Sequence, residues 1–128
     1  MRVLLDTRTL LWWVTDPDVL AKSTRNLLDD LSNEVLLSIV TPWELAIRTS
    51  TGKLDASEIL YDIERGQLNE EVRLLGTEIK HVIRAGRLPF HHRDPFDRLL
   101  IAQALDLRVP IVSNDKTFDL YGVQRIWD

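Results

Sequence analysis

The sequence contains no cysteine, and that absence excludes several kinds of chemistry. A chain without cysteine forms no disulfide framework, no thiolate-ligated zinc site and no cysteine nucleophile. Long hydrophobic runs are also missing, because apolar runs such as Val3–Leu5 and Val35–Leu37 fall far short of the ~20 residues that span a bilayer. The first residues, MRVLLD, are interrupted by charge too early for a signal peptide. We therefore expect no membrane segment and a cytoplasmic location.

Length and composition favour a single globular domain. The chain has 128 residues, of which 45% are hydrophobic and 28% are charged, as is typical of folded soluble proteins. A chain of this length forms one domain of ordinary size, so we expect a single domain over residues 1–128. The net charge is −4, from 20 acidic and 16 basic residues, so the chain as a whole does not attract nucleic acid. Any binding of nucleic acid must depend on the local distribution of charge.

Short apolar runs alternate with segments of helical spacing. The runs predicted as strands are residues 2–5, 34–38, 71–75 and 110–113, with 123–126 as a candidate fifth. Helices are predicted between them, several starting at a Ser, Thr or Asp cap, as at Thr41, Thr77 and Asp94. Strands joined through helices form parallel sheets, because parallel strands need crossover connections. The expected fold is therefore α/β, a three-layer α/β/α sandwich with a four- to five-stranded parallel sheet.

Four acidic residues are predicted to meet at one edge of this sheet. Asp6 and Asp115 each follow a strand. Glu44 and Asp97 stand in the first turns of helices that begin at the same edge. In open parallel sheets, ligands bind at the edge formed by the carboxyl ends of the strands. The sequence therefore predicts an acidic site built from four separate segments.

Each acid also has a local explanation that involves no shared site. Glu44 follows Thr41 by three residues, the spacing of a capping box, and Asp97 stands in the same relation to Asp94. The other two acids would cap a helix or form an Asx turn. Local roles do not explain why all four gather at one edge, where their charges would repel one another and raise their pKa values. A divalent cation would relieve this repulsion, and oxygen ligands without cysteine favour Mg²⁺, with Mn²⁺ as a substitute.

Other residue types in the sequence are open to structural interpretations. Residues 80–98 are rich in bases, and three of them have i, i+4, i+7 spacing and would share a helix face: Lys80, Arg84 and Arg87. This face would bind phosphates or would simply be exposed to solvent. His91 and His92 adjoin the predicted helix start at Asp94 and would contact a substrate or, as adjacent histidines in a loop usually do, simply lie at the surface. Trp43 falls in a hydrophobic pattern and is predicted to lie in the core.

Five segments carry the sequence pattern of a known family. They are LLDT at residues 4–7, WELAIR at 43–48, GKL at 52–54, HHRDPFDRLLIAQA at 91–104 and SNDKTF at 113–118. In order and spacing they resemble a PIN domain of the VapC toxin type, and the resemblance extends over nearly the whole chain. It implies an Mg²⁺-dependent endoribonuclease, the toxin of a bacterial or archaeal toxin–antitoxin pair. The expected partners are an RNA substrate, a cognate antitoxin and a second copy of the chain in a homodimer.

The resemblance also assigns roles to residues. The catalytic and metal-binding acids carry over onto Asp6, Glu44, Asp97 and Asp115. Candidates to orient these ligands without touching the metal are Thr7, Asp94 and Asn114. Candidate RNA contacts are Arg48, Lys53, Lys80, Arg84, Arg87, Arg93 and Arg98. The chain departs from the family pattern at Arg8, where relatives often have His, but this change leaves the acids intact.

By the same resemblance, the reaction is hydrolysis of a phosphodiester bond by water, which leaves 5′-phosphate and 3′-hydroxyl ends. Two other functions remain open from the sequence. A receiver-like phospho-acceptor domain also carries acids at strand ends and binds Mg²⁺, but here no acid pair follows the first strand and no acceptor acid follows the third, which ends at Leu75. A catalytically silent binding module is disfavoured by the intact set of four acids.

Overall fold

The computed structural model describes residues 1–68 and 72–128 of the chain. Its strands are β1 (Arg2–Leu5), β2 (Glu34–Ser38), β3 (Val72–Leu75), β4 (Ile111–Val112) and β5 (Arg125–Ile126). Its α-helices are α1 (Thr7–Thr15), α2 (Lys22–Asp29), α3 (Val40–Ser50), α4 (Ser57–Glu64), α5 (Ile79–Arg87) and α6 (Pro95–Leu107). Short 3₁₀ helices are η1 (Pro17–Val19) and η2 (Lys116–Tyr121). Glu71, predicted as the first residue of the third strand, lies outside the described residues.

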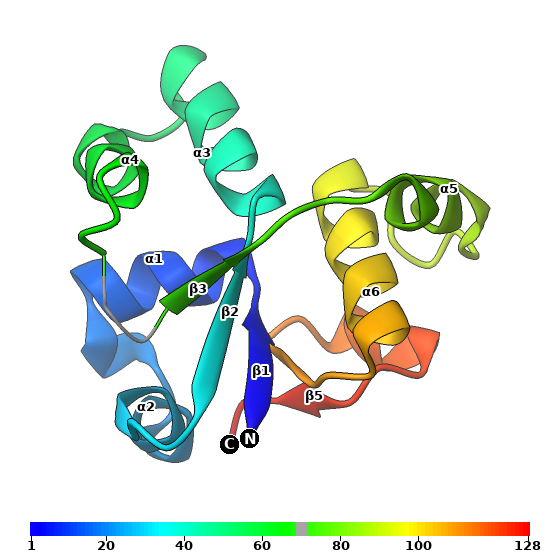
Figure 1. Ribbon diagram of the computed structural model, residues 1–128, viewed down its shortest axis with the longest axis horizontal. Helices are drawn as coiled ribbons and strands as arrows, with labels where there is room; N and C mark the ends of the chain where they lie inside the picture. Colours follow the sequence, from blue (N-terminus) through cyan, green and yellow to red (C-terminus); the bar gives the residue numbers. More distant parts are fainter. Residues whose placement is uncertain (69–71) are drawn as a thin grey trace.

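The five strands form one parallel sheet in the order β3-β2-β1-β4-β5 (Figure 1). β1 lies at its centre, where Leu4 pairs in register with Leu36 of β2 and with Ile111 of β4. The run Val3–Leu5 is fully buried, which explains why β1 is continuously apolar and does not alternate with polar residues. The predicted α/β fold with parallel strands between helices is confirmed.

Helices cover both faces of the sheet, which gives the molecule three layers (Figure 1). Along β1 the side chains alternate, so that Val3 and Leu5 pack with the layer of α1, α2 and α4, whereas Leu4 packs with the layer of α5 and α6. Leu100 and Ile101 of α6 are fully buried in the second layer. The carboxyl ends of β1 and β4 lie side by side because Leu5 pairs with Val112, so the segments that follow them begin at one edge.

Two helices begin at residues other than those predicted. α3 begins at Val40, one residue before the predicted cap Thr41. The hydroxyl of Thr41 instead lies 3.3 Å from that of Thr7 in a buried contact between α3 and α1. α5 begins after Glu78, not after Thr77, because Glu78 forms a reciprocal capping box with the third residue of the helix. Tertiary contacts, together with a competing cap, thus override the local cap signals.

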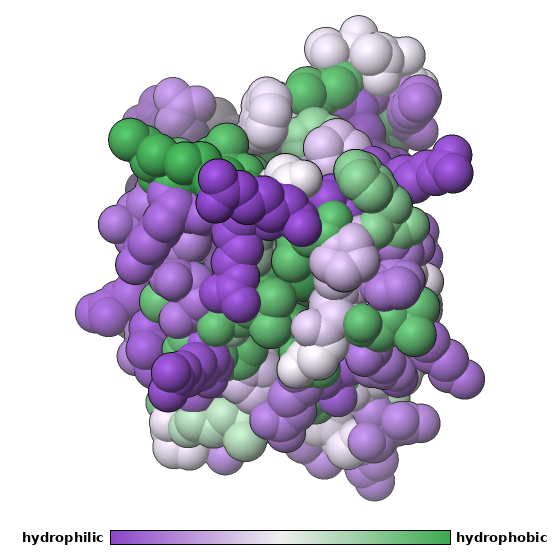
Figure 2. All heavy atoms as spheres, turned by 90° about the vertical axis from the view of Figure 1, so that its right-hand side faces the viewer, coloured by the Kyte–Doolittle hydropathy of each residue, from purple (hydrophilic) through white to green (hydrophobic). Residues whose placement is uncertain are grey.

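Trp43 is not a core residue, contrary to prediction, because 58% of its surface is exposed. It packs edge-on against Phe96 with 4.9 Å between ring centroids. Both helices that carry these residues border an apolar groove of about 650 Å³, whose lining includes Ile39, Trp43, Val82, Pro95 and Leu99. Hydrophobic side chains gather between hydrophilic ones on the side of α5 and α6 (Figure 2). Within the described ranges, no helix is long and apolar enough to cross a membrane.

Candidate metal centre

The four acids predicted to meet do line one pocket. It has a volume of about 260 Å³ and lies where β1 and β4 end and where α1 and α6 begin. Asp6 follows β1, Glu44 lies on α3, Asp97 lies on the first turn of α6, and Asp115 follows β4. The structure therefore brings four segments far apart in the sequence to the carboxyl edge of the sheet, which is where parallel sheets bind ligands.

Asp6 is buried and has the local role that the sequence allowed. Its Oδ1 accepts a hydrogen bond from the backbone N–H of Thr9 at 2.8 Å, so it caps α1. Burial raises the pKa of Asp6 above its ordinary value, although hydrogen bonds from Ser113 and Thr9 oppose the rise. Capping uses one carboxylate oxygen, and the residue also lines the acidic pocket.

Glu44 is not part of a capping box, because α3 begins at Val40 and places it beyond the first turn. Its side chain is 4% exposed and has two partners. The hydroxyl of Thr7 donates to its Oε1 at 2.7 Å, and Nη2 of Arg48 lies 2.9 Å from its Oε2. The capping-box explanation for Glu44 is therefore removed, and the hydroxyl of Thr7 holds this carboxylate by a hydrogen bond. A buried carboxylate at the pocket wall needs such partners.

Asp97 experiences the repulsion that the sequence predicts. Burial, followed by the charges of Asp94, Glu44, Asp6 and Asp115, raises its pKa to about 8. In the absence of a cation, Asp97 therefore keeps its proton at neutral pH. The shift measures how strongly this pocket resists a further negative charge, and a bound cation would reverse it.

Hydrogen bonds compensate the charge of Asp115. Burial alone would raise its pKa, but hydrogen bonds from the backbone and side chain of Thr117 and from His92 outweigh burial and hold the pKa below its ordinary value. The backbone N–H of Thr117 lies 3.0 Å from Oδ1, which forms the predicted Asx turn. Asp115 and Asp97 thus share a pocket but have pKa values shifted in opposite directions.

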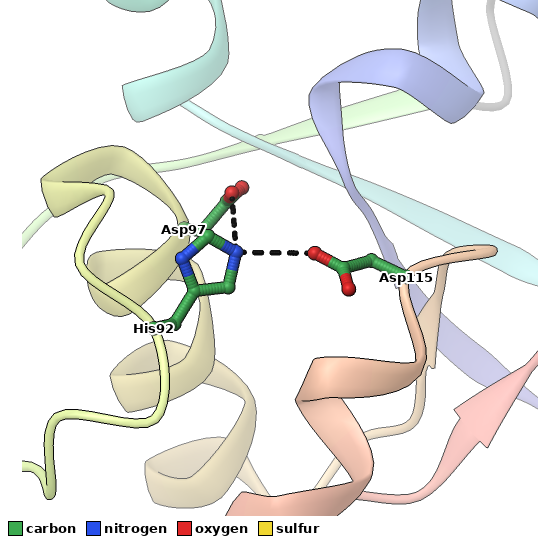
Figure 3. A group of neighbouring side chains, drawn as sticks. All are labelled: His92, Asp97 and Asp115. Atoms are coloured by element: carbon green, nitrogen blue, oxygen red, sulfur yellow. Dashed lines mark hydrogen bonds and ion pairs between the residues drawn. The ribbon is translucent and has the colours of Figure 1, made fainter.

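His92 belongs to the site, although the sequence pattern favoured a surface loop. Its Nε2 lies 3.0 Å from Oδ2 of Asp97 and 3.1 Å from Oδ2 of Asp115, between the two carboxylates (Figure 3). These three residues form a group whose ligand-type atoms all lie within 4.8 Å of one another. The available signal was its position two residues before Asp94, in a segment that returns to the acidic edge.

The other predicted supporting residues line the same pocket. Asp94 caps α6, because its Oδ1 accepts from the backbone N–H groups of Phe96 at 2.9 Å and Asp97 at 3.3 Å. Asn114 is exposed and contributes to the pocket wall. Asp94 affects the site without touching a metal ion, because its charge contributes to the raised pKa of Asp97.

Arg98, predicted as an RNA contact, has a structural role instead. Its side chain is 5% exposed and donates to the carbonyl oxygens of Ala85, Leu88, Pro89 and His92 at 2.7–3.0 Å. A guanidinium carries its donors in a fixed fork, which suits several carbonyls at once. Arg98 therefore fixes the segment before α6, and both terminal nitrogens of its guanidinium are bound to carbonyl oxygens.

The remaining basic candidates fall into two groups. Arg48 lines the pocket together with Arg8, which also lies 5.8 Å from the ring centroid of Trp12. The others are exposed and lie outside the pocket wall: Lys53, Lys80, Arg84, Arg87 and Arg93. Lys80 pairs with Asp106 at 3.2 Å. The predicted phosphate-binding face of α5 is thus not at the acidic pocket of a single chain.

The donor set fits a hard divalent cation. Its candidate ligands are carboxylate oxygens from several acids, and cysteine is absent from the chain. Two arginines line the pocket, and one of them is paired with Glu44. Burial and the charges of the other acids still raise the pKa of Asp97 in the presence of these arginines. A cation such as Mg²⁺ or Mn²⁺ would supply the missing charge.

Comparison with known proteins places this geometry in context. A family model for the PIN domain matches residues 3–123. Among solved structures, VapBC2 from Rickettsia felis bound to a DNA fragment from its promoter is 17% identical over 100% of both chains, with a TM-score of 0.72. DNA-bound VapBC from Salmonella typhimurium is 18% identical over 98% of this chain and 97% of that one, with a TM-score of 0.71. VapBC-1 from nontypeable Haemophilus influenzae is 21% identical over the same shares, with a TM-score of 0.65. No curated protein matches the sequence significantly.

Proposed function

The chain belongs to the PIN-domain family, and from that premise we propose that it is the toxin of a VapBC-like toxin–antitoxin pair and hydrolyses RNA with a divalent metal ion. One observation carries the proposal. Carboxylates from four separate segments line one pocket, and burial, together with the charges of the neighbouring acids, raises the pKa of Asp97 to about 8. A site that serves only the fold gains nothing from this repulsion, whereas a metal-dependent nuclease requires it.

The protein's own residues would prepare the site in several ways. The ion would be held by the four acids, Asp6, Glu44, Asp97 and Asp115. When bound, Mg²⁺ or Mn²⁺ supplies Lewis-acid activation of water and charge stabilisation at the phosphate. Thr7 and Arg48 hold the two oxygens of Glu44 in place, so that this carboxylate is oriented before substrate arrives. Arg48, exposed beside the pocket, would also attract the RNA phosphate.

The chemistry of the products tests the proposal. Hydrolysis with water as nucleophile leaves 5′-phosphate and 3′-hydroxyl ends, whereas attack by the RNA 2′-hydroxyl leaves a cyclic phosphate. We expect purified protein to cut single-stranded RNA with 5′-phosphate ends when Mg²⁺ or Mn²⁺ is present, and to stop when the metal is chelated. Cleavage that persists with chelator, or cyclic phosphate ends, would contradict the proposal.

A matched pair of variants assigns the cleavage to the pocket. Asp6→Asn removes one carboxylate from the pocket and should abolish cleavage while the fold is kept. Asp18→Asn removes one exposed carboxylate, paired with Arg25 at 2.9 Å, and should leave cleavage unchanged. A catalytically silent binding module would bind RNA but cut it in neither case. Labelling of the chain by acetyl phosphate would instead support the receiver-like alternative.

A cognate antitoxin is the proposed partner. The similar structures from Rickettsia felis and Salmonella typhimurium are VapBC complexes, and a nuclease of this kind needs restraint inside the cell. The pocket's uncompensated carboxylates would accept a basic side chain, and Arg suits them because its fork stays protonated when desolvated. The homodimer and the cytoplasmic location stay predictions.

A further inference from the structure

We propose that His92 is a positioning residue of the metal centre and not one of its ligands: its ring donates from Nε2 to Asp115, lies in contact with Asp97, and sets the spacing of these two carboxylates. The inference rests on the proposed function, since it concerns the same pocket. Under this proposal the four acids are the metal ligands, and His92 only positions two of them. The metal ion then has no nitrogen ligand from His92.

The hydrogen bond at the other ring nitrogen determines where the proton of His92 lies. The backbone N–H of Asp94 lies 3.2 Å from Nδ1 and can only donate. Nδ1 must therefore be the accepting nitrogen, without a hydrogen of its own. With no hydrogen on Nδ1, the proton of the ring is on Nε2. The Nε2–H then donates to Oδ2 of Asp115 at 3.1 Å, and Oδ2 of Asp97 lies 3.0 Å from the same nitrogen (Figure 3).

This arrangement is the reverse of the one that metal-binding histidines have. A ligating histidine offers the lone pair of one nitrogen to the metal and donates the N–H of the other to an acceptor. In His92, the nitrogen away from the carboxylates faces a donor, the backbone N–H of Asp94. Ligation through Nε2 would require the proton to move to Nδ1, where it would oppose that N–H. The ring can serve the site as a donor without any such change.

The loop that carries His92 is held at several points, so the ring has little freedom to turn. The backbone N–H of His92 donates to Oη of Tyr121 at 2.7 Å, and Tyr121 in turn donates to the carbonyl oxygen of Pro89 at 2.7 Å. The carbonyl of His92 accepts from Nη1 of Arg98 at 3.0 Å. The ring lies 5.7 Å from that of Phe118, between centroids. A donor held this firmly can fix two acids that come from different elements.

The two acids need such a bridge because they come from unrelated segments. Asp97 is carried by α6 and Asp115 by the turn that precedes η2, so no local hydrogen bond sets the distance between them. When both carboxylates are ionised, their like charges push them apart, and the N–H of His92 between them opposes this. Support from outside the coordination sphere commonly changes metal affinity 10–100-fold. Loss of the ring should therefore weaken binding of every divalent ion to a similar extent.

Nitrogen NMR tests the proton's position directly. In protein labelled with ¹⁵N at histidine, two-bond ¹H–¹⁵N correlations distinguish a protonated Nε2 from a protonated Nδ1. We expect the Nε2–H form of His92 both without metal and with saturating Mg²⁺. An Nδ1–H form with an unprotonated Nε2 in the Mg²⁺-loaded protein would overturn the proposal. The metal-free spectrum decides the tautomer even if no cleavage is found, so a failure of the proposed function remains distinguishable.

Metal binding by variants tests the role of the ring. We would measure Mg²⁺, Mn²⁺ and Co²⁺ affinity by calorimetry for wild type, His92→Ala, His92→Gln and the neighbouring control His91→Ala. His92→Ala should weaken all three ions about tenfold, His92→Gln should recover most of the loss because its amide still donates, and His91→Ala should match wild type. A ligand role predicts a selective loss of Co²⁺, which favours nitrogen donors, in both His92 variants, and this result would overturn the proposal. Unchanged affinities in His92→Ala would overturn it as well.

Discussion

Replacement of Asp97 by Asn should stabilise the metal-free protein at neutral pH. Asn has nearly the same shape as Asp, but it cannot ionise and so cannot add charge to a pocket that already holds Asp6, Glu44 and Asp115. Asp97 is the residue to change, because burial and these neighbours raise its pKa from 3.8 to about 8. The substitution removes this penalty while it retains a side-chain oxygen beside Nε2 of His92, which lies 3.0 Å from Asp97.

The sign and size of the effect follow from the shift. A carboxyl group with a higher pKa in the folded state binds its proton more tightly there, so its contribution favours folding below pH 3.8 and is lost as pH rises toward 8. One proton corresponds to about 1.4 kcal/mol per pH unit over this range. The unfolding free energy of wild type should therefore fall by up to about 4 kcal/mol between pH 4 and pH 7, beyond any change in the variant. We expect Asp97→Asn to be roughly 2–4 kcal/mol more stable at pH 7 and nearly equal at pH 4.

Urea unfolding at pH 4, 5, 6, 7 and 8, in the presence of chelator, measures this difference. Asp18→Asn is the control, because it removes an exposed carboxylate outside the pocket. Mg²⁺ should then stabilise wild type more than Asp97→Asn, since a ligand that binds only the folded state adds to its stability. Parallel profiles of unfolding free energy against pH for wild type and Asp97→Asn would refute the electrostatic reasoning.

Three further outcomes are expected. Glu44→Gln should lower the cleavage rate about 100-fold or more, equivalent to about 2.7 kcal/mol, because amides are poor ligands for a hard cation. Urea unfolding should change little, because Glu44 is outside the first turn of α3 and does not cap it. Full activity would show that the role of Glu44 is structural. Arg98→Lys should lower the unfolding free energy by about 2 kcal/mol, because an ammonium group cannot reach four carbonyls; an unchanged urea midpoint would contradict this. Raising Mg²⁺ tenfold above its Kd should weaken antitoxin binding up to about tenfold in a titration, if both occupy the carboxylates; equal affinity at all concentrations would place the antitoxin elsewhere.

The fold was predictable because its signals are local and repeated. Apolar runs that alternate with helical segments predict buried parallel strands. Val3–Leu5 has this pattern because β1 lies between two strands and two helical layers. The convergence of the acids followed from the same rule, since parallel strands bring their carboxyl ends to one edge. The role of Glu44 could not be decided from the sequence, because its spacing from Thr41 matches a capping box. The structure shows that α3 does not form this capping box.

The errors concern residues whose roles depend on packing between distant elements. Arg98 has the position of a surface base in the sequence, but it lies under the loop before α6 and binds that loop's carbonyls. His92 reaches the acidic pocket because of the path of the loop before α6. Hydrophobic periodicity predicts helices and strands but does not predict the path of a loop. Trp43 lies in an apolar pattern, yet α3 turns it toward the groove beside Phe96. Local sequence patterns determine where helices and strands form, whereas tertiary contacts determine the burial and the partners of these three side chains.

Single-turnover cleavage of a single-stranded RNA across an Mg²⁺ titration tests the central claim most directly, with wild type compared with the double variant Asp6→Asn/Asp97→Asn. Both acids line the pocket, and the double variant removes two of its carboxylates without removing the oxygen atoms that accept hydrogen bonds. The account predicts a rate that rises with Mg²⁺ and saturates for wild type, and no cleavage at any Mg²⁺ concentration for the double variant. Equal, Mg²⁺-dependent cleavage by both proteins would contradict it.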